Sequence, residues 1–193
     1  KEFDDPDPMR GFESQFLNIW HLRERKQVGR PVVDSEVWRG MSATVPDFPP
    51  DVVAVEAWFD LGVSVAQAWD TDGGVVVSVS DCASVPAAVA LVASIGCRGQ
   101  VLAGASLAEH PAWAEASVSV EPQTGSVRQV AAEFAKAIKE SSFRHGRSGV
   151  LTEQALGLRV ADGVDGVRVV SKGRADAIKA AMSNAGYSLT DDM

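Results

Sequence analysis

Apolar residues are concentrated in three short runs between residues 52 and 80. The runs are Val52 to Trp58, Gly62 to Trp69 and Val75 to Ser80, and valine dominates each of them. Asp70 to Gly74 separates the last two runs with the acidic residues and glycines that are typical of a tight hairpin. The pattern therefore predicts three consecutive strands that form an antiparallel meander.

Helical spacing of apolar residues follows in several later segments. The strongest is 126–140, where one face is apolar and Ser126 to Gln129 has the spacing of a capping box. The remaining expected elements are helices at 85–95, 110–115, 150–156 and around Asp176, strands at 100–105 and 117–120, and a hairpin formed by 158–161 and 167–170. This order predicts an α/β fold with a mixed sheet, three antiparallel strands first and helices on both faces.

The first fifty residues have a different character. Residues 11–25 carry an aromatic stripe at helical spacing, and 34–40 read as a short capped turn. Prolines at 46, 49 and 50 exclude regular structure there, so we interpret 26–50 as an extended connector. Because the chain begins with Lys1 and a segment rich in aspartate and proline, we expect another domain to precede it.

Composition narrows the functional classes. The chain has 193 residues, is 46% hydrophobic and 23% charged, and fits one globular domain. A net charge of -8 argues against nucleic-acid binding by bulk electrostatics. Cys82 and Cys97 lack the spacing of a zinc site or a disulfide framework, and no apolar stretch predicts a membrane span or a leader.

Two acidic residues stand out against their surroundings. Glu56 lies within the first predicted strand among valines, and it either faces solvent at a sheet edge or needs a partner. Asp176 is expected one turn inside a helix whose apolar face is Ala175, Ile178, Met182 and Ala185; it is either a solvated charge or part of a site. If the first strand is central, the last helix can cross it and bring the two carboxylates together. Such a pair suits Mg²⁺ or Mn²⁺, and two such ions about 3.5–4 Å apart can cleave a phosphodiester.

Several segments resemble the C-terminal part of large terminase subunits from tailed phages of actinobacteria. In that family an ATPase motor precedes an RNase H-like, metal-dependent nuclease that cuts concatemeric viral DNA during packaging. The run from Gly173 to Ala181 is the most specific, and the resemblance covers nearly the whole chain. The other segments that carry it are Phe12 to Trp20, Pro31 to Trp38, Ser126 to Gln129, Phe143 to His145, Leu151 to Gln154, and Leu158 with Arg159.

The resemblance implies a metal site and names its residues. Glu56 takes the first-strand position and Asp176 the last-helix position of a site for two Mg²⁺ or Mn²⁺ ions. The carboxylate expected at the end of the fourth strand is missing from Val101 to Ser106, so we rank Asp60, then Glu109, then Asp81 as substitutes. The second ion would then bind only when DNA is present.

The resemblance also implies DNA contacts by basic residues near these acids. Lys172, Arg174 and Lys179 surround Asp176, and they either contact the phosphate backbone or balance the helix charge. Arg144 and His145 lie in a second small basic segment that is either incidental or a phosphate contact.

The implied protein is an endonuclease domain that acts on double-stranded DNA in the host cytoplasm during virion assembly. Its expected partners are the ATPase domain of the same polypeptide, the portal and the small terminase subunit. We expect a helix and connector at 1–50, the nuclease domain at 51–187 and a flexible tail at 188–193. Two alternatives stay open: a catalytically weakened docking module, motivated by the missing carboxylate, and a Holliday-junction resolvase or transposase-like enzyme of the same fold.

Overall fold

The computed structural model describes residues 29–58, 62–123, 127–163, 166–169 and 175–184. Several expectations therefore lie outside the described residues. They concern the helix at 11–25, the tail at 188–193, and the side chains of Asp60, Lys172, Arg174 and Ala185.

The three predicted strands are confirmed as a meander at the centre of the molecule. Strand β2 (Val52–Ala57) pairs antiparallel with β3 (Val63–Thr71), which pairs antiparallel with β4 (Gly74–Cys82). Two residues, Asp72 and Gly73, connect β3 to β4, and this Asp-Gly loop is typical of a tight hairpin.

Three further strands complete a six-stranded mixed sheet. Strand β5 (Gln100–Gly104) runs parallel to β2, β6 (Glu121–Gln123) parallel to β5, and β7 (Phe143–His145) parallel to β4. The strand order is β6-β5-β2-β3-β4-β7, so β2 lies in the interior of the sheet, as predicted.

Two details of the predicted strands are wrong. Residues 117–120 form no strand, because Ser117 adopts a left-handed backbone conformation with φ 56° and the strand starts only at Glu121. Residues 143–145, expected as a basic loop, instead add β7 to the sheet edge.

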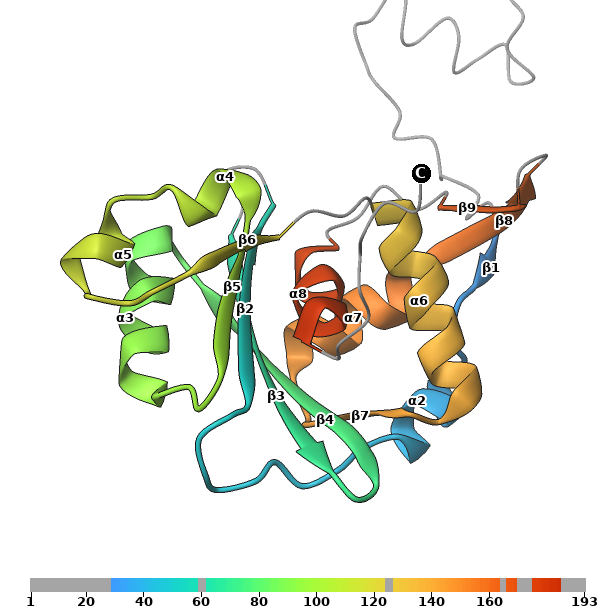
Figure 1. Cartoon of the computed structure of the whole chain (residues 1–193). Coiled ribbons are helices and arrows are strands. Elements are labelled where there is room, and N and C mark those ends of the chain that lie inside the picture. Colours follow the sequence, from blue (N-terminus) through green and yellow to red (C-terminus); the bar gives the residue numbers. More distant parts are fainter. Residues whose placement is uncertain (1–28, 59–61, 124–126, 164–165, 170–174, 185–193) are drawn as a thin grey trace, which may run out of the picture.

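Three helices cover one face of the sheet (Figure 1). They are α3 (Val85–Ile95), α4 (Ala105–Ala108) and α5 (Ala112–Glu115). The N-cap Ser84 begins α3 by accepting a hydrogen bond from the Ala87 N–H, and Gly96, at φ 69°, ends it. The buried side chains between sheet and helices are apolar: Val53, Val55, Val63, Val65, Ala88, Val89, Val92, Leu107 and Trp113.

The opposite face is covered by α8 (Asp176–Asn184), with α6 (Val127–Glu140) and α7 (Gly149–Gly157) beside it (Figure 1). The prediction of a single apolar face on the last helix is too narrow. Between the sheet and its neighbouring helices α8 is buried nearly all round, at Ala177, Ile178, Ala180, Ala181 and Met182, and Ala175 just before it is buried as well. Small alanines allow this close approach, because a larger side chain would hold the helix away from the sheet.

The N-terminal described segment belongs to the same core. The short capped turn predicted at 34–40 is helix α2 (Ser35–Gly40), whose N-cap is Asp34; the Asp34 carboxylate accepts from the Glu36 N–H at 2.7 Å. Its Trp38 is 3% exposed and packs with the residues of α6, α7 and α8. A second sheet joins β1 (Arg30–Pro31) to the predicted hairpin of β8 (Arg159–Gly163) and β9 (Gly166–Val169).

Candidate metal centre

Glu56 lies near the carboxyl end of β2, on the face that α8 covers. Side chains alternate along a strand, so Glu56 shares this face with Ala54, whereas Val53 and Val55 face α3. Glu56 is 5% exposed, which excludes the interpretation of a solvated edge residue. Its Oε1 accepts from Lys179 Nζ at 2.7 Å and from Gln123 Nε2 at 2.9 Å.

Asp176 is the first residue of α8, whereas the sequence pattern placed it one turn inside the helix. At the first position the partial positive charge of the helix N-terminus favours a carboxylate. The side chain is 2% exposed, and its oxygens accept from Ser64 Oγ at 2.8 Å and from Gln154 Nε2 at 2.9 Å. Gln154 also accepts from the Ala177 N–H at 2.9 Å, which holds the amide and the helix start in one arrangement.

The two carboxylates belong to one polar cluster, as the sequence predicted they would if β2 were central. Ser64, the cross-strand neighbour of Glu56, donates to Asp176. Lys179, three residues after Asp176 on α8, reaches Glu56. We call the set of Glu56, Ser64, Gln123, Gln154, Asp176 and Lys179 the acidic cluster. It lies at the carboxyl ends of the parallel strands β2, β5 and β6, the end of an α/β sheet where ligands usually bind.

Gly104 occupies the place next to Glu56 on the neighbouring strand. A Cβ built there would lie 2.7 Å from Glu56 Oε2, so the missing side chain makes room for this carboxylate. Within Val101 to Ser106, where the resemblance implies an acid, Gly104 is thus the residue next to the Glu56 carboxylate, whereas Ser106 is exposed on α4.

The two described substitutes for that acid do not fill the gap. Asp81 is exposed and pairs across the sheet with Ser64, and Glu109 is exposed just after α4. Within the described ranges, no three acidic, histidine or cysteine side chains are grouped so that they could hold a metal ion. Asp81 does act on its neighbour: burial raises the pKa of the Cys82 thiol, and the Asp81 charge raises it further.

The donor set of the acidic cluster decides which cation it suits. Glu56 and Asp176 offer the carboxylate oxygens that hard divalent cations prefer. The contacts of Glu56 with described residues, from Lys179 and Gln123, are both to its Oε1. The other carboxylate oxygen, Oε2, lies next to Gly104. Within the part of the chain that the structure describes, the charged groups of the cluster are these two carboxylates and the ammonium group of Lys179.

The predicted basic residues fall into different places. Arg144 and His145 lie on β7, where Arg144 pairs with Val76 of β4. Val76 is five residues along β4 from Asp81, which pairs with Ser64 of the acidic cluster, and this offset corresponds to roughly 16 Å along the strand. His145 is 4% exposed, stacks on Trp38 with ring centroids 3.9 Å apart, and has both ring nitrogens near backbone carbonyl oxygens. A phosphate contact by His145 would require the ring to leave this place.

Three cluster residues were not predicted from the sequence. Ser64 carries a signal, because it interrupts an apolar strand at a position that faces the core, as Glu56 does. Gln123 and Gln154 carry none, since isolated glutamines in a short strand and a helix are ordinary on a protein surface.

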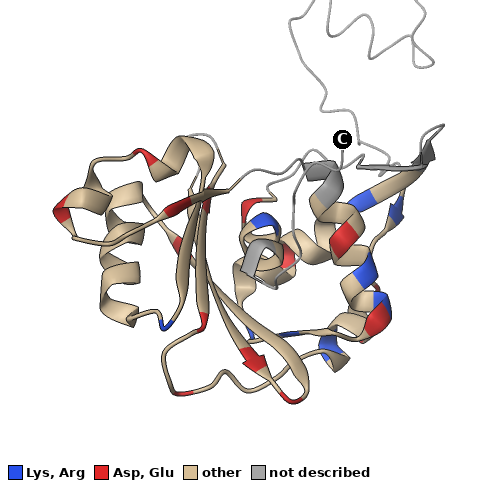
Figure 2. Cartoon of the chain, viewed as in Figure 1, with Lys and Arg blue, Asp and Glu red and all other residues tan. Residues whose placement is uncertain are grey.

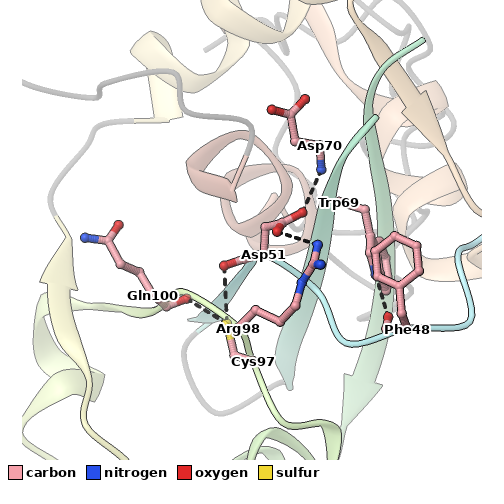
Figure 3. Close-up of polar contacts among 7 residues, drawn as sticks. All are labelled: Phe48, Asp51, Trp69, Asp70, Cys97, Arg98 and Gln100. Atoms are coloured by element: carbon pink, nitrogen blue, oxygen red, sulfur yellow. Dashed lines mark hydrogen bonds and ion pairs between the residues drawn. The ribbon is translucent and has the colours of Figure 1, made fainter. Parts of the chain in front are cut away.

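The other end of β2 carries a separate polar group (Figure 3). Asp51 pairs with Arg98 at 2.6 Å and accepts from the Asp70 N–H at 3.0 Å. The Arg98 guanidinium lies 4.7 Å from the centre of the Phe48 ring. Both charged side chains are accessible, 50% exposed for Arg98 and 35% for Asp51, so this is a surface ion pair.

Basic residues are distributed unevenly over the molecule. Arg98 is the only lysine or arginine between residues 51 and 123, a stretch that contains the helices α3, α4 and α5. Figure 2 shows the other basic segments on the opposite side, over α2, α6, α8 and the small sheet. Most lysines and arginines of the described residues therefore lie on the side of α6 and α8, away from α3, α4 and α5.

No helix in the described part of the chain has both the length and the apolar composition needed to cross a membrane.

The sequence matches no family model and no curated protein. The structure is nevertheless similar to several solved large terminases of bacteriophages. The large terminase of bacteriophage HK97 aligns with a TM-score of 0.59 and 13% identity, over 83% of this chain and 43% of that chain. The P22 large terminase nuclease domain aligns with a TM-score of 0.57 and 17% identity, over 82% of this chain and 91% of that one.

A third similar structure is the large terminase nuclease from the thermophilic phage G20c with bound magnesium. It aligns with a TM-score of 0.51 and 16% identity, over 77% of this chain and 95% of that chain. This chain thus spans less than half of the HK97 large terminase and nearly all of the two separate nuclease domains. The mixed sheet with helices on both faces is the RNase H-like fold of these nuclease domains, which confirms the predicted fold class.

Proposed function

We propose that this chain is the nuclease domain of a phage DNA-packaging terminase and that it cleaves double-stranded DNA with the help of a divalent metal ion. The observation that carries the proposal is the burial of Glu56 and Asp176 in one cluster, at the carboxyl ends of the central strands of this fold. Burying two acids is unfavourable unless positive charge or hydrogen-bond donors compensate for it. A site that binds a cation and a phosphodiester gives a reason to keep them.

Glu56 and Asp176 would hold the ion, Mg²⁺ or Mn²⁺. When bound, such an ion polarises the phosphate and lowers the pKa of a water molecule. Ser64 and Gln154 fix the orientation of the Asp176 carboxylate through their hydrogen bonds. The side of α6 and α8, over which Figure 2 shows basic segments, would face the DNA backbone. Lys172 and Arg174, which precede Asp176 in the sequence, and the more distant Arg144 would be the contacts.

The complete protein would place this domain in a larger assembly. An ATPase domain of the same polypeptide, the portal and the small terminase subunit are the proposed partners, and concatemeric viral DNA in the host cytoplasm is the proposed substrate. The magnesium and cobalt ions bound to the G20c nuclease support the choice of a divalent cation.

Cleavage of plasmid DNA by this chain tests the proposal. We expect nicking and linearisation with Mn²⁺ or Mg²⁺ and none with a chelator. Asp176→Asn should lower the rate by at least about 100-fold, since changes to groups that only support metal ligands already lower activity 10- to 100-fold. Asp51→Asn is the matched control, because it removes a carboxylate at the other end of β2 and should leave cleavage unchanged.

Thermal unfolding of both variants separates loss of chemistry from loss of fold. Equal cleavage by wild type and Asp176→Asn would refute the site assignment.

A second candidate function rests on Gly104 and Lys179. The fourth-strand position has no carboxylate, and an ammonium group already neutralises Glu56. Such a domain could have lost its chemistry and serve as a docking module for the motor or the portal. In that case calorimetry detects no Mn²⁺ binding at millimolar concentrations, and the domain still binds its packaging partners.

A further inference from the structure

Lys179 places a positively charged group inside the acidic cluster. The Lys179 side chain is 20% exposed, and its Nζ lies 2.7 Å from Glu56 Oε1, while the Glu56 side chain is 6% exposed. An ammonium group at this distance is a fixed cation inside the acidic cluster. The ammonium group contacts Oε1 of Glu56, and Oε2 of the same carboxylate lies next to Gly104, which has no side chain.

We propose that Lys179 takes the place of one of two metal ions, so that the cluster works with a single divalent cation bound by Glu56 and Asp176. This inference rests on the proposed function, since it concerns the same site. Glu56 would use Oε1 for Lys179 and Gln123 and keep Oε2, on the Gly104 side, for the ion.

Charge balance supports the replacement. Three carboxylates with two divalent cations carry one net positive charge. Two carboxylates, one ammonium group and one divalent cation carry the same net charge, so the phosphate would meet an equivalent field. A second divalent cation would add two charges beside Lys179, where the described residues supply no third carboxylate to offset them, and Coulomb repulsion would oppose its binding.

The absence of a side chain at Gly104 and the presence of Lys179 are both consistent with the replacement of one metal ion. A carboxylate side chain at Gly104 would have to displace Glu56, because even a Cβ would lie 2.7 Å from Oε2. The lysine supplies charge from the helix side, where the Glu56 carboxylate can accept it without a side chain on β5.

Calorimetric titration of the whole chain with Mn²⁺ tests the inference without using activity. We expect one ion per chain for wild type. Lys179→Met should bind Mn²⁺ about tenfold more tightly, because the competing ammonium group is gone, yet cleave DNA at least about tenfold more slowly. Lys179→Arg keeps the charge and should keep the wild-type affinity within about threefold.

Arg98→Met is the matched control, since it removes an exposed basic side chain at the other end of β2 and should change neither affinity nor cleavage. Opposite changes in metal affinity and cleavage rate for Lys179→Met are a result that a merely structural lysine would not give. Two ions bound to wild type, or unchanged Mn²⁺ affinity in Lys179→Met, would overturn the inference. The first result needs no variant to fold.

The two proposals fail in different ways. Wild type that binds one Mn²⁺ but cleaves no DNA contradicts the nuclease function and leaves the single-cation site standing. Wild type that cleaves DNA with two bound ions contradicts only the role of Lys179.

Discussion

Strand β2 has an ion pair at each end, and the two pairs differ in burial. Asp51 and Arg98 meet at 2.6 Å at the amino end, with 35% and 50% of their side chains exposed. Glu56 and Lys179 meet at 2.7 Å at the carboxyl end, with 6% and 20% exposed. Similar distances therefore conceal different energetics, since water solvates the first pair and is largely excluded from the second.

The difference explains why only one end of the strand is a candidate site. A solvated pair contributes about 0–1 kcal/mol and constrains little around it. A buried pair must be matched by further donors, which here are Gln123 on Glu56 and the hydrogen bonds of Ser64 and Gln154 on neighbouring Asp176. The contribution of each group to the stability of the protein can be measured by substituting one residue at a time.

The largest effect is expected from Lys179→Met. It leaves the Glu56 carboxylate buried with one amide donor, and such a change costs about 3 kcal/mol of unfolding free energy. Urea denaturation in the presence of a chelator measures this loss, and added Mn²⁺ should recover part of it. A loss below about 1 kcal/mol would place this pair with the surface pair at Asp51 and remove the distinction.

A smaller effect is expected from Gly104→Ala. The backbone of Gly104, at φ -49° and ψ 142°, accepts alanine, but the new Cβ must displace Glu56 Oε2. We expect a loss of about 1–3 kcal/mol in urea denaturation, as for overpacked cores. Gly157→Ala at the end of α7, where a Cβ meets nothing within 4 Å, is the control and should lose nothing; equal results for the two would show that Glu56 yields freely.

The smallest effect is expected from Arg98→Met at the exposed pair. The loss should stay below about 1 kcal/mol and shrink further in 0.5 M NaCl, where charges are screened within about 4–5 Å. Denaturation curves at two salt concentrations check it. A loss as large as that of Lys179→Met would mean that burial does not distinguish the two ends of β2.

Much of the sheet could be predicted from the sequence because its central strands are covered by helices on both faces and are therefore apolar along most of their length. The valine-rich runs predicted β2, β3 and β4. The glutamate within the first run indicated either a solvent-facing edge residue or a charge that needs a partner, and only the structure distinguishes the two. The expectation of a strand at 117–120 failed because Val118 and Val120 alternate like strand residues but pack as a loop against the α3 side. Periodicity alone does not distinguish these two cases.

The acidic cluster could be predicted only in part. Glu56 and Asp176 carry a signal in their apolar surroundings, and the absence of an acid from β5 is visible in the sequence. The partners Gln123 and Gln154 become evident only when the register of β6 and the position of α7 are known. Helical spacing placed Lys179 near Asp176, as either a DNA contact or a charge that balances the helix, but spacing does not tell which strand the side chain reaches.

The position of α8 also has a consequence for how the chain matures. This helix comes last among the described elements, yet it is buried nearly all round between the sheet, α6 and α7. On a ribosome, Glu56 is made 120 residues before Asp176, and the sheet face under α8 stays uncovered until that helix emerges. The acidic cluster can therefore form only after α8 has been synthesised, so the proposed DNA-cutting centre cannot assemble on a polypeptide that still lacks this helix.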